Sequence, residues 1–317
     1  MKQKEDYLCS FTQIKRAIDK LSKNVVCYFV DYKVFSKRSV YEISKDFKIN
    51  NLINKNILII HTCLRLEIYS FTGNLSFSNS NLFAEIKNKL AIRRLITLMC
   101  GMQSEIFGEK EILGQIEKSI VDSALEGFLK KDSFWHLLDL VKFAKFLRNK
   151  FKINCNENYS SVGINILNKL IKKENECISI IGDGYMSEFF FKKLDRKRPY
   201  KIFWINRNIE KAKKIQRGSD LLKKLQISHI DIKEGLKVLN QSDFVFAALK
   251  NSEGLFAGYQ FNHPKAIVDV SYPPVFSDDC NKFFYSIENT FFEKYIKKPI
   301  KKIFLRSCES EIEEIIN

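Results

Sequence analysis

The chain has 317 residues, of which 45% are hydrophobic, and this is enough to fill the cores of two domains. Its 53 basic and 37 acidic side chains give a net charge of +16, which favours a polyanionic partner such as nucleic acid. No apolar run approaches the roughly 20 residues of a membrane span, no secretory signal is evident, and the cysteines lack paired spacing. We therefore expect a soluble cytoplasmic protein with reduced thiols and without a metal site.

The first half of the chain predicts a small α+β layer followed by a helical section. Residues 1–24 are expected to form an N-terminal extension, either as a loose leading helix or as a partly ordered segment. A helix is expected at 39–47. Branched and aromatic runs predict strands at 25–30, 57–61 and 66–71. From 81 to 151 the apolar residues recur at helical spacing.

Cys63 lies where a predicted strand gives way to a loop, because the apolar run before it stops at His61-Thr62. Such positions are where sheets present reactive groups. A cysteine beside a fixed cation such as Arg65 can ionise near neutral pH, which makes Cys63 a candidate nucleophile. A small buried apolar cysteine would explain the same pattern.

A polar loop at 101–115 precedes a predicted helix. In this loop Ser104, Glu109 and Gln115 could share one pocket. Alternatively, Glu109 and Glu111 favour the positive end of the helix dipole. The next predicted helix, 133–150, places three cations on one face, where they could contact a phosphate backbone or simply be solvated. These cations are Lys142, Lys145 and Arg148.

The second half predicts a nucleotide-binding domain. Ser160-Ser161 are candidate caps for a helix through 172, and the apolar strand 177–181 then runs into a glycine turn at 182–187 and a helix through 194. This context suits a dinucleotide, because glycines let a pyrophosphate approach backbone N–H groups at a helix start. The third glycine position is Ser187. The candidate cofactor-binding residues are Gly182, Asp183, Gly184, Tyr185, Met186, Ser187, Asn206 and Arg207.

The next strand, 201–205, ends in Asn206-Arg207 instead of an acid, and an arginine there suits the 2′-phosphate of NADP. Further strands at 243–248 and 266–270 alternate with helices, as in a doubly wound parallel sheet. We therefore predict an α/β protein in which an α+β catalytic domain with a helical section precedes a Rossmann-like NADP-binding domain. The expected boundaries are 1–24 extension, 25–157 catalytic domain, 158–286 nucleotide domain and 287–317 short helical tail.

These motifs, in this order, resemble the glutamyl-tRNA reductase family. The family's Ser-Thr-Cys-Asn-Arg-x-Glu-Ile/Leu-Tyr motif is similar to 61–69, and its Gly-Leu-Asp-Ser-x-x-x-Gly-Glu-x-Gln-Ile-Leu-Gly-Gln motif is similar to 101–115. Shorter stretches at 160–162, 206–207, 268–270 and 285–286 also agree.

The resemblance implies NADPH-dependent reduction of glutamyl-tRNA(Glu) to glutamate 1-semialdehyde through a Cys63 thioester. This is the first committed step of tetrapyrrole (haem) synthesis by the C5 route. It implies Cys63 and Arg94 as catalytic residues, NADPH as the cofactor and glutamyl-tRNA(Glu) as the partner, with the downstream semialdehyde aminotransferase as a further candidate partner. The implied substrate-binding residues are Thr62, Leu64, Arg65, Ser104, Glu109, Lys110, Glu111 and Gln115.

Several positions depart from the family pattern. Arg94 stands where the family has a histidine, and a guanidinium stays protonated, although it could lower the pKa of Cys63 or bind a carboxylate. Leu64 replaces an asparagine, His61 replaces a serine, and the family's Gly-x-Asn-His-Lys appears as 29–33 with only Lys33 kept. The chain also ends near where a helical dimerisation domain would begin, so a short form is expected and a homodimer stays open.

Two alternatives use the same residues. One is a degenerate, non-catalytic relative that binds tRNA or a pathway partner. The other is an NADP-dependent reductase of a different thioester or aldehyde.

Overall fold

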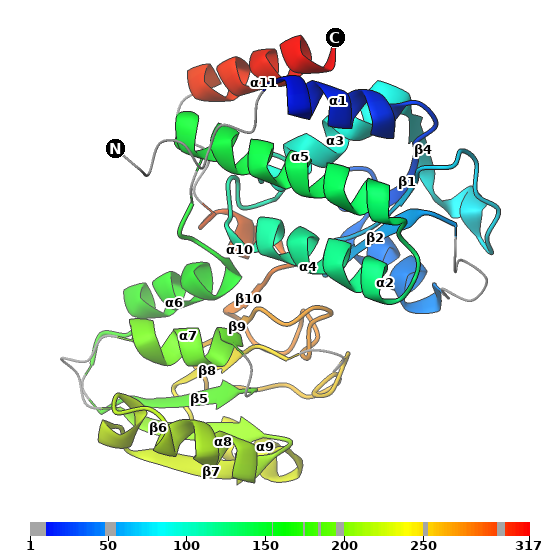
Figure 1. Cartoon of the computed structure of the whole chain (residues 1–317). Coiled ribbons are helices and arrows are strands. Elements are labelled where there is room, and N and C mark those ends of the chain that lie inside the picture. Colours follow the sequence, from blue (N-terminus) through cyan, green and yellow to red (C-terminus); the bar gives the residue numbers. More distant parts are fainter. Residues whose placement is uncertain are drawn as a thin grey trace. The chain divides into compact units, whose positions relative to one another are not determined.

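The computed structural model describes residues 11–47, 55–153, 155–173, 175–182, 185–194, 200–249, 253–296 and 302–317 (Figure 1). The chain divides into two compact units, Met1–Asn156 with Lys298–Asn317, and Glu157–Lys297. Within the described part, none of the helices has both the length and the apolar content that a membrane crossing requires.

The first unit is built on an antiparallel sheet with strand order β2-β3-β1-β4. Its strands are β1 (Val26–Asp31), β2 (Ile57–Thr62), β3 (Arg65–Ser70) and β4 (Ala84–Lys87). The three strands predicted from branched and aromatic runs are confirmed. The prediction of helix from residue 81 onwards is wrong at β4, because this four-residue edge strand alternates half-buried and exposed positions and is too short to register as a pattern.

Helices cover both faces of this sheet. They are α1 (Phe11–Ser22), α2 (Lys37–Asp46), α3 (Asn88–Met99), α4 (Glu111–Leu125), α5 (Lys131–Lys150) and α11 (Lys302–Ile316), with a 3-10 turn at Ser80–Leu82. Alternation along β1 divides its side chains, so that Cys27 and Phe29 join the core under α1, α3, α4, α5 and α11, whereas Val26 and Tyr28 pack on the face that α2 covers.

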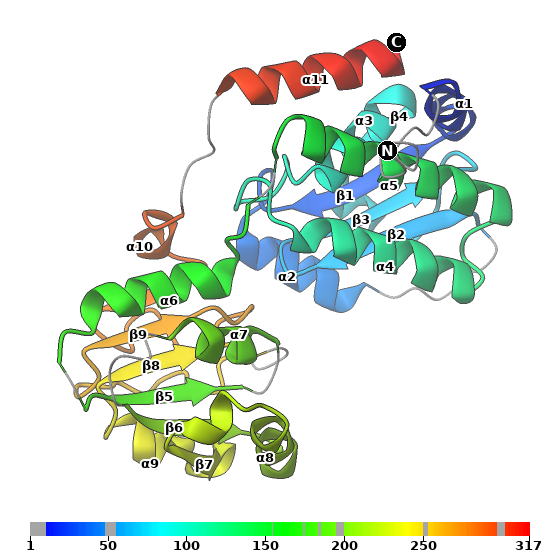
Figure 2. The same cartoon turned by 60° about the vertical axis from the view of Figure 1, so that its left-hand side comes forward.

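Two parts of the expected domain division are corrected. The segment expected as a loose helix or partly ordered extension contains α1, which is not loose, because its Ile14, Ala17, Ile18 and Leu21 are buried in the main core of the first unit. The expected separate tail is divided, because α11 buries Cys308 and Ile312 in the same core. Figure 1 and Figure 2 both show α11 beside α1 and α3. Apolar residues at helical spacing make both helices parts of the first unit.

The second unit contains a parallel sheet with strand order β10-β9-β8-β5-β6-β7 in its described part. Its strands are β5 (Cys177–Ile181), β6 (Lys201–Asn206), β7 (Ile227–Asp231), β8 (Phe244–Ala247), β9 (Ala266–Asp269) and β10 (Phe284–Ser286). Its helices are α6 (Tyr159–Leu170), α7 (Tyr185–Lys193), α8 (Ile209–Arg217), α9 (Gly235–Leu239) and α10 (Thr290–Glu293), with 3-10 turns at Leu222–Lys224 and Ile232–Glu234.

The doubly wound prediction is confirmed, although β7 and β10 were not expected. The chain winds outwards from β5 through β6 to β7 and then returns to β8, so the direction reverses between β5 and β8. Ligands of open α/β sheets bind at this reversal, beyond the carboxyl ends of the strands. The start of α6 is also corrected, because Asn158 is its cap and Ser161 completes a capping box with it.

Candidate active site

Cys63 lies in the two-residue turn that joins β2 to β3. Thr62 pairs with Arg65 across the hairpin, which leaves Cys63 and Leu64 as the connection. Leu64 is buried, and its carbonyl accepts a 3.2 Å hydrogen bond from the Tyr32 backbone N–H. Cys63 is exposed and forms no disulfide. The buried Leu64 therefore fixes the turn, while Cys63 is exposed to solvent. An exposed thiol at the end of a strand is what the sequence predicted for Cys63.

A buried ion network begins two residues beyond this turn. Alternation along β3 places Arg65, Glu67 and Tyr69 on one face of the strand. The Glu67 carboxylate accepts hydrogen bonds from Arg65 Nη1 at 3.0 Å, from Arg94 Nη2 at 2.8 Å and from the Tyr69 hydroxyl at 2.7 Å. Arg94 Nη2 also pairs with Asp31, which lies opposite Arg65 in the register between β1 and β3.

Two guanidinium groups therefore balance two buried carboxylates. Burial alone would raise the pKa of Glu67, but the charges of Arg94 and Arg65 and the hydrogen bonds of Arg94 and Tyr69 outweigh it, so the pKa lies below its ordinary value. The Arg94 guanidinium also lies 3.7 Å from the centre of the Phe29 ring. Arg94 is thus a fixed cation within a salt-bridge network.

The loop between α3 and α4 closes over this network through Gln103. The Gln103 carbonyl accepts hydrogen bonds from Arg65 Nη2 at 2.8 Å and from the Tyr32 hydroxyl at 3.1 Å. Its side-chain oxygen accepts a 2.9 Å hydrogen bond from Lys33 Nζ. Burial and the nearby positive charge of Arg65 lower the pKa of Lys33 from its ordinary value, against the opposing effect of Asp31. Three separate segments thus supply cations to one small region.

Both interpretations of the cationic helix face, a phosphate contact or a solvated surface, are wrong for Arg148. Arg148 is buried and donates to the carbonyls of Gly108 at 2.8 Å and Glu109 at 3.0 Å. It lies so close to the loop that a Cβ on Gly101, which has φ +75°, would be 2.9 Å from Arg148 Nη1. Helix periodicity located the face correctly but could not show that this part of it packs inwards. The other two cations of that face pair with Asp139 and Glu117.

The predicted substrate residues of this loop fall into two groups. Ser104 is buried, and its hydroxyl forms no hydrogen bond with the residues that the structure describes. Burial raises the pKa of the half-buried Glu109 carboxyl, and the positive charges of Arg65 and Arg148 oppose this rise. Lys110 and Gln115 are exposed, and Glu111 is the first residue of α4, where a carboxylate favours the helix dipole. Of these residues, Glu109 lies near enough to Arg65 for the two charges to interact.

Sequence reasoning overlooked Asp31, Tyr32, Glu67 and Gln103 as site residues. Glu67 carried a usable signal, because Arg65, Glu67 and Tyr69 alternate along a predicted strand and must share a face. Asp31 and Gln103 carried none, since their proximity depends on strand pairing and loop closure.

The predicted glycine turn lies at the reversal point of the second sheet. Gly182 follows β5 with φ +113°, and a Cβ there would lie 2.4 Å from the carbonyl oxygen of Ala248, directly after β8. The Trp204 indole N–H donates to the Gly182 carbonyl at 2.7 Å. A residue with a side chain does not fit here. Asp183 and Gly184 lie outside the described residues.

The remaining nucleotide-site predictions surround this turn. Tyr185 and Met186 begin α7, and Ser187 is fully buried with a hydroxyl that has no partner among the described residues. Asn206 is buried at the end of β6, where Oδ1 likewise has no partner in the described part, and Arg207 follows it on the surface. A tight glycine turn, unsatisfied buried polar atoms and an exposed cation fit a phosphorylated dinucleotide.

Comparisons with known proteins agree with this two-part architecture. The family model for the glutamyl-tRNAGlu reductase N-terminal domain matches residues 23–149, and the model for shikimate / quinate 5-dehydrogenase matches residues 165–288. The glutamyl-tRNA reductase of Francisella philomiragia is 24% identical over 330 residues, covering 90% of this chain and 78% of the relative. That of Francisella tularensis subsp. novicida is 23% identical, with the same shares covered.

Among solved structures, the glutamyl-tRNA reductase from Methanopyrus kandleri is 16% identical, with a TM-score of 0.46. It covers 93% of this chain and 79% of its own length.

Proposed function

We propose, since this chain belongs to the glutamyl-tRNA reductase family, that it reduces glutamyl-tRNA(Glu) to glutamate 1-semialdehyde with Cys63 as the nucleophile. Family membership makes the chain an oxidoreductase of tetrapyrrole synthesis with a nicotinamide cofactor. The observation that carries the finer proposal is the exposed Cys63 thiol, which lies in an anchored turn two residues from the buried guanidinium of Arg65.

In the first step the Cys63 thiolate attacks the carbonyl carbon of the aminoacyl ester. A carbon–sulfur bond forms, the ester carbon–oxygen bond breaks, and the tRNA ribose leaves as a hydroxyl after taking up a proton. A nicotinamide cofactor bound at the second unit would supply a hydride to the thioester carbon. The new carbon–hydrogen bond would replace the carbon–sulfur bond, so that the aldehyde leaves and Cys63 returns to the thiolate. The thiolate, and not the thiol, is the form of a cysteine that attacks a carbonyl carbon.

Arg65 is the residue that we assign to the carboxylate of the glutamyl group. Its bonds to Glu67 and Gln103 use one hydrogen on each terminal nitrogen, and these bonds fix the plane of the guanidinium. The other hydrogen on each terminal nitrogen can then form the paired bonds that an arginine makes with a carboxylate. We assign Glu109, whose charge interacts with that of Arg65, to the α-ammonium group, and Thr62, which pairs with Arg65 across the hairpin, to a further contact with the glutamyl group.

Arg94 has a positioning role in this scheme and does not act as a base. It holds Glu67 and Asp31 in place and thereby orients Arg65, which shares the Glu67 carboxylate with it. A histidine at this position would carry at most part of a charge near neutral pH, whereas Arg94 balances the second buried carboxylate permanently.

We propose NADPH as the cofactor. Gly182 and the start of α7 would hold its pyrophosphate, and Arg207, directly after β6, would bind the 2′-phosphate. The preference for NADPH over NADH rests on Arg207, because it stands where an acid would otherwise bind a free 2′-hydroxyl.

The test is turnover of glutamyl-tRNA(Glu) with NADPH, followed as NADPH oxidation and as semialdehyde formed. Wild-type protein should form the aldehyde, Cys63→Ser should form none, and Cys177→Ser, which changes a buried thiol at the start of β5 in the other unit, should keep activity. Retained turnover in Cys63→Ser would refute the thioester. Wild-type protein that binds both ligands without forming aldehyde would refute the reductase and favour a non-catalytic binding relative.

A further inference from the structure

Helix α1 and the residue that directly follows it carry a run of exposed cations, which we call the basic face of α1. Four of its members lie within nine residues, and all four are exposed. They are Lys15, Arg16, Lys20 and Lys23. The exposed Asp19 is the acidic residue among them. The opposite side of the helix is buried and is formed by Ile14, Ala17, Ile18 and Leu21. The cations therefore face the solvent.

These four cations form no ion pair with any residue that the structure describes. Other exposed lysines of the chain commonly do, as Lys118 pairs with Asp122, Lys223 with Asp220 and Lys237 with Glu234. Like charges one helical turn apart repel one another. The basic face of α1 is therefore a local concentration of uncompensated positive charge, distinct from the general basic composition of the chain.

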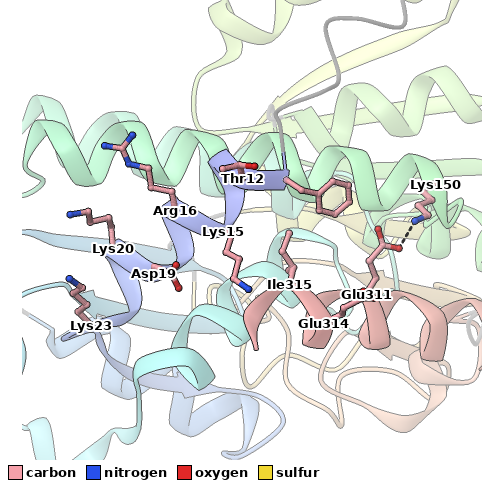
Figure 3. A pocket seen from close by; sticks show the side chains of 11 residues that line it. Thr12, Lys15, Arg16, Asp19, Lys20, Lys23, Lys150, Glu311, Glu314 and Ile315 are labelled. Atoms are coloured by element: carbon pink, nitrogen blue, oxygen red, sulfur yellow. Dashed lines mark hydrogen bonds and ion pairs between the residues drawn. The ribbon is translucent and has the colours of Figure 1, made fainter.

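A cavity of about 810 Å³ lies along this helix, between α1 and α11. Figure 3 shows Arg16, Lys20 and Lys23 on the part of α1 away from Glu311 and Glu314. Glu311 is neutralised by Lys150, whose Nζ lies 2.6 Å from Oε2. Glu314 also lines the cavity and is exposed, and its negative charge disfavours an anion there. A polyanion therefore fits along the outer face of α1 and does not fill the cavity.

Both helices that border the cavity lie outside the matched family ranges. The matches cover 23–149 and 165–288, whereas α1 ends at Ser22 and α11 begins at Lys302. The basic face therefore belongs almost wholly to a part of the chain to which the family models assign nothing.

We propose that the basic face of α1 binds the phosphate backbone of the tRNA whose aminoacyl end reaches Cys63. This inference rests on the proposed function for the identity of the RNA. Arg16 and Lys20 are four residues apart, about 6 Å along the helix, and Lys23 directly follows the end of α1. This arrangement suits two or three successive phosphates of one strand. A cation that contacts phosphate supplies affinity and orientation without reading sequence.

The experiment measures binding of uncharged tRNA(Glu) by fluorescence anisotropy at several salt concentrations. One variant combines Arg16→Gln, Lys20→Gln and Lys23→Gln. The matched control combines Lys118→Gln, Lys223→Gln and Lys237→Gln, which removes the same charge from exposed positions elsewhere. The α1 variant should bind about tenfold more weakly, and the slope of log K against log salt should fall by about 2 to 3, while the control stays near wild type.

Turnover separates this inference from the proposed function. In the α1 variant KM for glutamyl-tRNA should rise while kcat stays unchanged, because the substituted residues are remote from the reacting atoms. If wild-type protein forms aldehyde but the α1 variant keeps wild-type KM and salt slope, the inference fails and the function stands. If both triple variants lose affinity equally, overall charge is responsible and the inference also fails. Loss of tRNA binding in the α1 variant alone, with no aldehyde from wild type, would keep the inference and refute the function.

Discussion

Arg94 donates two hydrogen bonds to Glu67, from Nη2 at 2.8 Å and from Nε at 3.2 Å, and so ties helix α3 to strand β3. The same guanidinium pairs with Asp31 on β1. These ion pairs explain why this chain can have a permanent cation at position 94, where glutamyl-tRNA reductases have a histidine. With both Asp31 and Glu67 fully buried, one arginine could not balance the two charges, and Arg65 and Arg94 together do.

Substitution of Arg94 should destabilise the first unit strongly. Arg94→Met leaves a buried carboxylate without its partner, which costs about 3–5 kcal/mol, and Arg94→Lys should recover part of this loss. The measurement is urea unfolding. Arg93→Met is the matched control, because its neighbouring guanidinium pairs with Glu313 at the surface and should contribute about 1 kcal/mol or less. Equal effects of the two methionine variants would contradict the buried network.

The acid dependence of stability should identify Glu67. Because the folded-state pKa of Glu67 is lowered, its contribution is fully present above about pH 4.5 and is lost as the pH falls through the folded pKa. The difference in unfolding free energy between wild type and Glu67→Gln should therefore shrink as the pH falls below 4.5. Tyr69→Phe removes a hydrogen bond that lowers this pKa. In this variant the loss of unfolding free energy on acidification should therefore begin at a higher pH. A difference that is constant with pH would contradict the assignment.

The sequence predicted those parts of the site that depend on neighbouring residues. A strand ending at Cys63 follows from an apolar run, and Gly182 follows from a strand, turn and helix in succession. The ion network could not be predicted, since Asp31, Glu67 and Arg94 come together only when β1, β3 and α3 pack. Arg148 shows the same limit, because periodicity places it on a face but does not reveal that the loop carbonyls cover it.

Substitution of Gly182 should remove cofactor binding. Gly182→Ala places a methyl group 2.4 Å from a backbone carbonyl at a φ that favours glycine, so β5 and β8 must separate or the turn must change. We expect a destabilisation of about 1–3 kcal/mol and loss of dinucleotide binding. Gly218→Ala is the control, because its nearest neighbour would lie 3.5 Å away with an ordinary φ, and it should be neutral or slightly stabilising. Thermal unfolding and cofactor fluorescence measure the two effects.

Arg207 should determine the choice between the two nicotinamide cofactors. If its guanidinium binds the 2′-phosphate, Arg207→Ala loses a charged hydrogen bond of about 1.5–3 kcal/mol, so affinity for NADPH falls about 10- to 100-fold while affinity for NADH changes little. Arg217→Ala removes the same charge from the last turn of α8 and controls for the general potential of the surface. Titration of wild type and both variants with each cofactor gives the ratio of NADPH affinity to NADH affinity directly. An equal loss for NADPH and NADH would place the 2′-phosphate elsewhere, and a loss in Arg217→Ala as large as in Arg207→Ala would attribute the preference to overall charge.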